Sequence, residues 1–418
     1  MSTRLLLPGV LLLCTVIAGC GGGGTDETAS ASASAPASAT PATGTPATAS
    51  APVNLPVQQS TVPNQQPVTV GATPGLTRNM LMTSVTVCEP GTDHCATIDN
   101  VQVDTGSQGL RLLASALPAD LALPAQPSAT GTVGECAVFG TGYAWGAVRS
   151  ADVRMAGEVA AALPVHIIAD ASVPTVPADC GRAGLALMTT SALRGNGILG
   201  IGLFAADCGG GCASSALPRW YYTCATDGTC TSTMQPVASQ VTNPVSQFAF
   251  DNNGVVIELP AVPDMGASSV TGSLTFGIGT QANNSLGGAT VLKANSVTGY
   301  VTTTVGGKVY TQSFFDSGSN GLFFASPTLN VCGLWYCPTS TQTSAATIKG
   351  AGSATNTLSF QVGNAQALFA TPNFAFNNLA GTAGNVFDWG LPFFFGRKVF
   401  TAIDSRATPA GPGPYYAF

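Results

Sequence analysis

The sequence predicts an all-β protein, on three observations. Charged residues make up only 8% of the 418-residue chain, whereas about a quarter is usual for a soluble domain. Few stretches have helical periodicity, and short apolar runs broken by Gly, Asn and Pro dominate, which is typical of strands joined by turns. A motif of alternating polar and glycine residues also occurs twice with identical spacing, which indicates an internal duplication.

The duplicated motif is Val103–Leu110, which returns as Phe315–Leu322 with Asp, Gly, Ser, Gly and Leu at the same positions. One Asp-Thr-Gly or Asp-Ser-Gly alone is common in ordinary turns, where Asp binds its own backbone and Gly supplies positive φ. The pair, flanked by apolar β-type residues, is far harder to explain in that way. Two such turns face to face would let two carboxyl groups share one proton, an arrangement suited to activating water for attack on an amide.

Residues 1–19 read as an export signal, because Arg4 precedes the apolar run Leu5–Ile17. This run is too short for a confident membrane span. The segment Val16–Cys20 resembles a bacterial lipobox, which implies cleavage before Cys20, lipidation of Cys20 and, with Gly21 following, retention at the outer membrane. The alternative is a plain secretory signal followed by a chance cysteine.

Residues 20–76 form the next unit. They are mostly Gly, Ala, Ser, Thr, Pro and Gln, with only Asp26 and Glu27 charged. Such a composition cannot bury a core. We therefore expect a lipidated Cys20 followed by a disordered tether, with the folded part beginning near Thr77.

Ten of the 12 cysteines remain after Cys14 in the signal and Cys20 at the lipid site are set aside. An even number in an exported chain implies disulfides, although the spacing leaves their connectivity open. Closeness in sequence suggests the pairs Cys88–Cys95, Cys208–Cys212, Cys224–Cys230 and Cys332–Cys337, which leaves Cys136–Cys180. We expect no metal, because there is no Cys-x-x-Cys and the two histidines, His94 in a loop and His166 in a strand, lie in no ligand motif.

Three segments between the two motifs have recognisable patterns. Val138–Val148 predicts a β-hairpin with a glycine-rich tip. Asn196–Leu203 predicts a buried strand whose glycines allow close backbone approach. Ala205–Thr233 predicts a disulfide-tied surface loop; the alternative is that its exposed aromatic residues Trp220-Tyr221-Tyr222 hold a peptide, a glycan or a partner.

Together these features resemble the pepsin-like aspartic proteases. The resemblance implies a bilobal acid-protease fold with a central cleft, an N-terminal lobe at 77–243 and a C-terminal lobe at 244–418. Pro244–Phe250 is similar to the crossing between the lobes, Gly272–Gly279 to the strand and turn that open the second lobe, and Leu391–Asp404 to the family's C-terminal helix and strand. The implied site residues are the catalytic Asp104 and Asp316, the supporting Thr105, Gly106, Ser107, Ser317, Gly318 and Ser319, and a flap of Phe139, Gly140, Thr141, Gly142 and Tyr143.

The chain departs from the family pattern at three positions. Phe139 replaces the flap tyrosine, Arg111 replaces a tryptophan, and Pro392 stands where glycine is expected, with Gly390 two residues earlier. If Arg111 points toward Asp104, it would stabilise an ionised carboxylate and disturb proton sharing.

The resemblance implies an outer-membrane-anchored aspartic endopeptidase that acts through a water activated between two aspartates and needs no cofactor. We expect a peptide or protein substrate, membrane attachment through Cys20, and a monomer. With a net charge of −6, the chain has no electrostatic footprint for nucleic acid. Two alternatives stay open: a catalytically inactive pepsin-like lipoprotein that binds a peptide or an envelope partner, and a structural lipoprotein whose aspartate turns are scaffold. Serine hydrolysis is disfavoured, because Gly-x-Ser-x-Gly does not occur.

Overall fold

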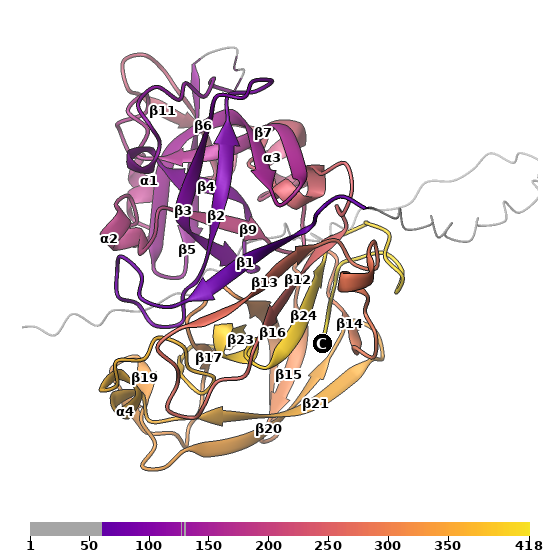
Figure 1. Ribbon diagram of the computed structural model, residues 1–418. Helices are drawn as coiled ribbons and strands as arrows, with labels where there is room; N and C mark the ends of the chain where they lie inside the picture. The colour runs from indigo at the N-terminus through magenta and orange to yellow at the C-terminus, as the bar shows by residue number, and fades with distance from the viewer. Residues whose placement is uncertain (1–60, 127, 129–130) are drawn as a thin grey trace, which may run out of the picture.

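The protein is all-β, as the sequence predicts. The computed structural model describes residues 61–126, 128 and 131–418, and their helices are all short. Figure 1 shows the N-terminal half of the chain, coloured indigo to magenta, above the C-terminal half, coloured orange to yellow. The α-helices are α1 (Ala178–Gly181), α2 (Thr190–Leu193), α3 (Gly210–Ser214) and α4 (Ala365–Phe369). The expected export signal and the lipid site Cys20 lie outside the described residues.

A 16-stranded sheet contains all strands of the N-terminal half. Within it β6 pairs with both β7 and β2, so that β2, β3, β9, β4, β7 and β6 close into a ring around an apolar interior. The strands of this half are β1 (Gln65–Val70), β2 (Leu81–Cys88), β3 (Cys95–Asp104), β4 (Gln108–Leu113), β5 (Thr132–Phe139), β6 (Gly142–Met155), β7 (Glu158–Ile168), β8 (Leu185–Ala186), β9 (Gly197–Ile201), β10 (Tyr221–Cys224) and β11 (Cys230–Ser232).

The same sheet continues into the C-terminal half, because β1 pairs antiparallel with β13 along its whole length, from Gln65↔Thr275 to Val70↔Val270. Figure 1 shows these strands where the two halves meet. The C-terminal members are β12 (Gly254–Leu259), β13 (Val270–Phe276), β14 (Val291–Lys293), β24 (Arg397–Ala402) and β25 (Tyr415–Ala417).

Strand β1 corrects the boundary of the expected tether, which was placed at residue 76. Val68 and Val70 are fully buried, whereas Pro67, which precedes them, and Thr69, which lies between them, are exposed. This is the period-two pattern of a strand with one face in the core. In the sequence this segment reads as part of the tether, because the residues around it are polar and only two valines show the alternating burial of a strand.

A 9-stranded sheet forms the rest of the C-terminal half. Its buried face carries a cluster of aromatic rings in which Trp389 lies 4.3 Å from Phe387 and 6.2 Å from Phe315, measured between ring centres. The strands are β15 (Val301–Val305), β16 (Lys308–Asp316), β17 (Leu322–Phe324), β18 (Val331–Cys332), β19 (Trp335–Tyr336), β20 (Gln342–Lys349), β21 (Thr355–Val362), β22 (Ala380–Thr382) and β23 (Val386–Gly390).

The duplication seen in the sequence is also a duplication of strand topology. In the first half β9 lies parallel to β3 and antiparallel to β4. In the second half β23 lies parallel to β16 and antiparallel to β17. Each half therefore threads one strand between the two strands that flank its aspartate turn.

The threading strand of the second half corrects the expectation about Pro392. The glycine opposite Asp316 is Gly390, as Gly200 is opposite Asp104. A Cβ at Gly390 would lie 2.1 Å from the carbonyl oxygen of Gly321, so only glycine fits. Pro392 instead lies in a short 3₁₀ turn, Leu391–Phe393, and β24 follows, so Leu391–Asp404 contains a turn and a strand.

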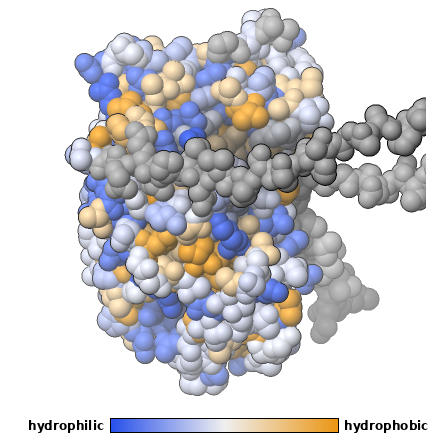
Figure 2. Space-filling model, turned by 90° about the vertical axis from the view of Figure 1, so that its right-hand side faces the viewer, coloured by the Kyte–Doolittle hydropathy of each residue, from blue (hydrophilic) through white to orange (hydrophobic). Residues whose placement is uncertain are grey.

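The surface is mixed in character. Figure 2 shows hydrophobic residues in small groups among hydrophilic ones on the face that it draws. Among the described residues, no helix has the length and hydropathy needed to cross a membrane.

Candidate active site

The first aspartate turn is held by its own backbone and serine. Asp104 ends β3, and its side chain is buried. The Gly106 N–H donates to Oδ1 of Asp104 at 2.8 Å, and the Ser107 hydroxyl donates to Oδ2 at 2.5 Å. Both oxygens of the carboxyl group therefore have a fixed donor, which sets the direction of the group.

The second turn repeats this pattern. Asp316 ends β16, and its side chain is partly exposed. Gly318 N–H donates to Oδ1 of Asp316 at 2.8 Å, and the Ser319 hydroxyl donates to Oδ2 at 2.8 Å. The supporting residues expected from sequence thus occupy equivalent positions in both turns.

Four hydrogen bonds join the two turns to each other. The Thr105 N–H donates to the Ser317 hydroxyl at 3.1 Å, and the Ser317 N–H donates to the Thr105 hydroxyl at 2.9 Å. In addition, the Thr105 hydroxyl donates to the carbonyl of Phe315 at 3.0 Å, and that of Ser317 donates to the carbonyl of Val103 at 2.8 Å. Thr105 and Ser317 are both buried, so the two turns form one hydrogen-bonded unit.

The two carboxyl groups face each other across this unit. A Cβ at Gly106 would lie 2.6 Å from Cγ of Asp316, and a Cβ at Gly318 would lie 2.6 Å from Oδ1 of Asp104. Each glycine therefore leaves the space that the opposite carboxyl group occupies. The structure brings together all the turn residues that the sequence singled out.

Proximity changes the acidity of the pair. Burial first, then the negative charges of Asp104 and Asp388 and a hydrogen bond with Asp104, raise the pKa of Asp316 well above its usual value. Two close carboxyl groups in a partly desolvated site cannot both ionise freely. The pair therefore favours a state that holds one shared proton.

The expected flap is a β-hairpin formed by β5 and β6. Phe139 pairs with Gly142, and Gly140 and Thr141 form the exposed turn between them. The Phe139 side chain is half-buried and packs against an apolar cluster of the N-terminal half that includes Leu113, Ala137, Ala144, Ile168, Leu187, Leu193 and Ile198. Tyr143 is buried in a second apolar cluster, together with Cys136 and Trp145.

The guanidinium of Arg111 is bound by groups outside the aspartate pair. It donates to Oε1 of Glu135 at 2.5 Å and to the carbonyl of Gln108 at 2.6 Å, and it lies 3.4 Å from Oδ2 of Asp207. Its guanidinium carbon also lies 5.8 Å from the centre of the Phe139 ring. Arg111 and Phe139 thus contact each other at the positions where the pepsin-like pattern has tryptophan and tyrosine.

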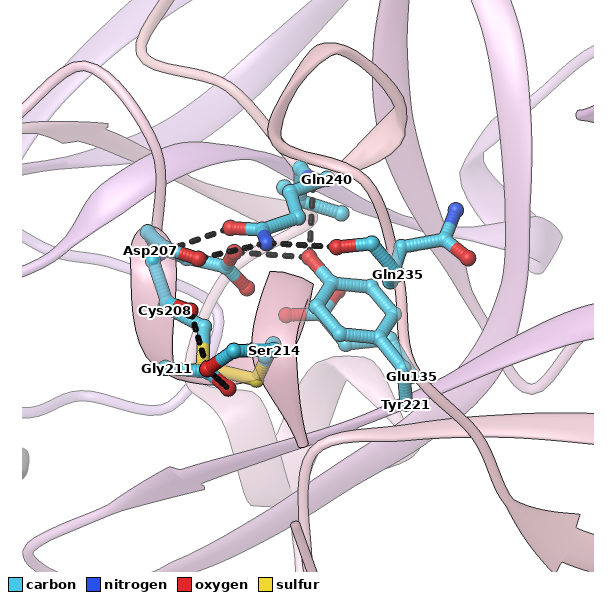
Figure 3. Close-up of a disulfide and its surroundings, with 12 residues drawn as sticks. Glu135, Asp207, Cys208, Gly211, Ser214, Tyr221, Gln235 and Gln240 are labelled. Carbon is cyan, nitrogen blue, oxygen red and sulfur yellow. Dashed lines mark hydrogen bonds between the residues drawn. A yellow bond between two sulfur atoms is a disulfide. The ribbon is translucent and has the colours of Figure 1, made fainter. Parts of the chain in front are cut away.

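Arg111 belongs to a buried polar cluster together with Glu135, His166, Asp207 and Tyr221. Oε2 of Glu135 lies 2.9 Å from Nδ1 of His166, and the Tyr221 hydroxyl donates to Oδ1 of Asp207 at 2.6 Å. Figure 3 shows the Tyr221 hydroxyl directed at Asp207, beside the Cys208–Cys212 disulfide. The cluster ties the hairpin strand β5 to β4, β7 and the cysteine-rich loop.

The two acids of this cluster, Glu135 and Asp207, have pKa values shifted in opposite directions. Burial alone would raise the pKa of Glu135, but the charges of Arg111 and His166 outweigh it and lower that pKa. Burial and the charge of Glu135 raise the pKa of Asp207 well above its usual value. Glu135 is therefore the anion that balances Arg111.

The sequence reasoning missed three acids of this region whose side chains are buried: Glu135, Asp207 and Asp388. Glu135 and Asp388 stand inside apolar runs of strand type, Val133–Val138 and Val386–Trp389. A lone charge in such a run must be paired or neutral, and this was the signal that could have identified them.

The aromatic residues of the cysteine-rich loop are not an exposed binding group, contrary to the alternative considered above. Tyr221 and Tyr222 are buried, and Trp220 is half-buried. Tyr222 packs edge-on against Trp145 at 5.4 Å and donates its hydroxyl proton to Asp179 at 2.6 Å. These rings fill the interior.

All five disulfides have the predicted pairing. They join Cys88–Cys95, Cys136–Cys180, Cys208–Cys212, Cys224–Cys230 and Cys332–Cys337. In the described part of the chain no group of three or more His, Cys, Asp or Glu side chains is arranged to hold a metal ion.

The fold and the site define an all-β protein with two aspartate turns joined at the meeting of its halves. The chain belongs to the family described as "Protein of unknown function (DUF3443)", whose model matches residues 60–418. A search of the curated proteins finds no match to it.

The hydrogen bonds between the turns predict strong energetic coupling. We expect Thr105→Val and Ser317→Ala each to lower the free energy of unfolding by about 1–3 kcal/mol, because each leaves a buried N–H unpaired. Thr105→Val removes the bonds of its hydroxyl to the Ser317 N–H and the Phe315 carbonyl, whereas Ser317→Ala removes those to the Thr105 N–H and the Val103 carbonyl. Because each pair of bonds holds the turns in the position that the other pair needs, the double variant should lose less than the sum of the two losses. Urea unfolding of the four proteins measures this, with the exposed hydrogen-bonded pair Thr347 and Thr357 as the matched control. Strict additivity at Thr105 and Ser317 would contradict the joined-turn structure.

The Arg111 cluster predicts a second stability effect. Arg111→Met should cost about 3–5 kcal/mol, because it leaves the charge of Glu135 buried and unbalanced. Adding Glu135→Gln should recover part of that loss. Arg154, which pairs with Asp93 at the surface, is the control, since exposed pairs contribute about 0–1 kcal/mol. Equal losses for Arg111→Met and Arg154→Met, measured by urea unfolding, would show that the cluster is not balanced as described.

Proposed function

We propose that this protein is an aspartic-type endopeptidase with a two-lobed, pepsin-like arrangement. One observation carries the proposal: Asp104 and Asp316 face each other, and Thr105 and Ser317 lock their turns together. In this proposal the lobes are residues 77–243, extended at the start by β1, and residues 244–418. The cleft lies between them, and the β5–β6 hairpin is its flap.

The proposed chemistry needs only the side chains of the pair. The pair holds one shared proton, and the raised pKa of Asp316 favours that residue as the acid, with Asp104 acting as the base. Asp104 accepts a proton from a water bound between the two groups as that water attacks the peptide carbonyl carbon. Asp316 gives its proton to the carbonyl oxygen, so one general base and one general acid act in the same step.

The number of protons on the aspartate pair determines how cleavage depends on pH. Cleavage needs one proton on the pair, so it falls at low pH when both groups are protonated and at high pH when both are ionised. The two apparent pKa values of that profile belong to the pair and not to either residue. Burial and the charge of Asp104, which raise the pKa of Asp316, extend the active range of the pair upward from the usual range of a carboxyl group.

We also propose that the protein is exported and held at the outer membrane by a lipid on Cys20. The apolar run Leu5–Ile17 and the lipobox-like Val16–Cys20 support this proposal. Disulfides support export independently, because they persist in oxidising compartments. The proposed substrate is then a peptide or unfolded protein outside the cytoplasm. We propose that the protein acts as a monomer.

The alternative is a protein that binds a peptide in the same cleft without cleaving it. One feature favours it: Phe139, at the position of the flap tyrosine, has no hydroxyl group to donate a hydrogen bond. The contact of Arg111 with Phe139 nevertheless keeps the hairpin attached to the strand that follows the first aspartate turn. We therefore favour hydrolysis.

The test is cleavage of fluorescein-labelled casein, an unfolded protein, by the purified protein from pH 3 to 7. We expect cleavage that a statine-type inhibitor blocks and that Asp104→Asn or Asp316→Asn lowers by at least about 10³-fold, because each variant removes a member of the acid–base pair. Asp264→Asn, at an exposed aspartate of the same half as Asp316, is the control and should retain activity.

Two results would contradict the proposal. Cleavage that survives either active-pair substitution would assign the activity to other residues. No cleavage at any pH, combined with inhibitor binding by the unsubstituted protein, would favour the peptide-binding alternative.

A further inference from the structure

A third carboxyl group lies beneath the second aspartate turn. Asp388 is on β23, two residues before Gly390, the residue that pairs with Asp316. Its neighbours Phe387 and Trp389 point into the aromatic core. Because side chains alternate along a strand, Asp388 points to the opposite face, toward the turn. Only 6% of the residue is exposed.

The surroundings of Asp388 disfavour a charge on it. Its Oδ1 has no hydrogen-bond partner, and no ion pair in the described part of the chain includes it. The titratable groups near it are Asp104 at the end of β3, Asp316 at the end of β16, and Tyr416 on β25. All of these are acids, so an ionised Asp388 would be buried without compensation, which is costly.

The acidity of Asp388 agrees with this geometry. Burial first, and then the charge of Asp104, raise the pKa of Asp388 well above its usual value, against a hydrogen bond with Ser319 that lowers it. Ser319 is also the residue whose hydroxyl donates to Oδ2 of Asp316. One serine hydroxyl therefore lies between the two acids.

The first half of the chain has no counterpart to this acid. Gly200 pairs with Asp104 as Gly390 pairs with Asp316, and two residues before Gly200 is Ile198. Ile198 is buried in an apolar cluster, and its side chain cannot donate a hydrogen bond. The two otherwise matched turns thus differ at this position.

We propose that Asp388 is a positioning residue, a neutral acid that donates its proton to Oγ of Ser319 and so keeps the Ser319 proton on Asp316. A serine hydroxyl has one proton and accepts through its oxygen. A neutral Asp388 therefore completes the chain Asp388–Ser319–Asp316 in one direction. An ionised Asp388 would accept that proton instead, leave Asp316 without its donor, and add a negative charge beside the pair.

This inference rests on the proposed function for its kinetic consequence, but its hydrogen bond can be tested without activity. Infrared difference spectra at pH 7, each taken between the purified unsubstituted protein and one variant, should reveal the C=O stretch of a protonated carboxylic acid. Asp388→Asn should remove one such band, and Ser319→Ala should shift the same band, because its hydrogen-bond partner is lost. Asp264→Asn should leave it in place. Absence of a band that depends on Asp388, or a band indifferent to Ser319→Ala, would overturn the inference whether or not the protein cleaves peptides.

The kinetic test compares two substitutions of similar shape with casein as substrate. Asp388→Val cannot donate to Ser319 and should lower kcat by about tenfold, the equivalent of one hydrogen bond, with KM nearly unchanged. Asp388→Asn can donate from its amide group and should recover most of that loss. Its pH profile should also shift on the alkaline side, since the acid at residue 388 no longer titrates. Equal kcat for Asp388→Val and the unsubstituted protein, with unchanged urea unfolding, would overturn the positioning role.

Discussion

The reciprocal hydrogen bonds between Thr105 and Ser317 are the constraint on which the rest of the structure depends. These residues are 212 positions apart, and each satisfies the buried N–H of the other. Buried backbone groups must be paired. Where a strand ends in a turn, the neighbouring strand no longer supplies an acceptor for the next backbone N–H. Each turn therefore relies on the other for the partner of one buried N–H, and these bonds hold the two halves together at this point.

The glycines of the two halves follow from the same constraint. Gly106 and Gly318 leave room for the opposite carboxyl group, and Gly200 and Gly390 let the threading strands pass against the turns. A side chain at any of these positions would displace backbone or a carboxyl group. Gly106 and Gly318 of the duplicated motif are thus explained by the close approach of the opposite carboxyl group, more than by flexibility of the turns.

The protein buries acids near the candidate site in two different ways. Glu135 is an anion that Arg111 compensates, and this cluster supports the base of the hairpin. Asp388 has no cation beside it, and burial favours its neutral form. The first arrangement holds elements together through charge, whereas the second supplies a hydrogen-bond donor of defined direction. Both occur at positions where the duplicated halves differ, since Phe323 stands at the spacing of Arg111 and Ile198 at the spacing of Asp388.

The sequence by itself determined the all-β class and the two aspartate turns, and it suggested the five disulfide pairs that the structure contains. These are properties of short segments: period-two apolar runs, cysteines four to seven residues apart in most pairs, and turn residues repeated at fixed spacing. Only the tertiary structure decided that β1 belongs to the sheet, that Gly390 is the residue beneath the second turn, that the Arg111 guanidinium binds Glu135, and that Asp388 lies beside Ser319. Each of these depends on which distant strand becomes a neighbour, because the direction and the protonation of a buried side chain are set by the groups that surround it.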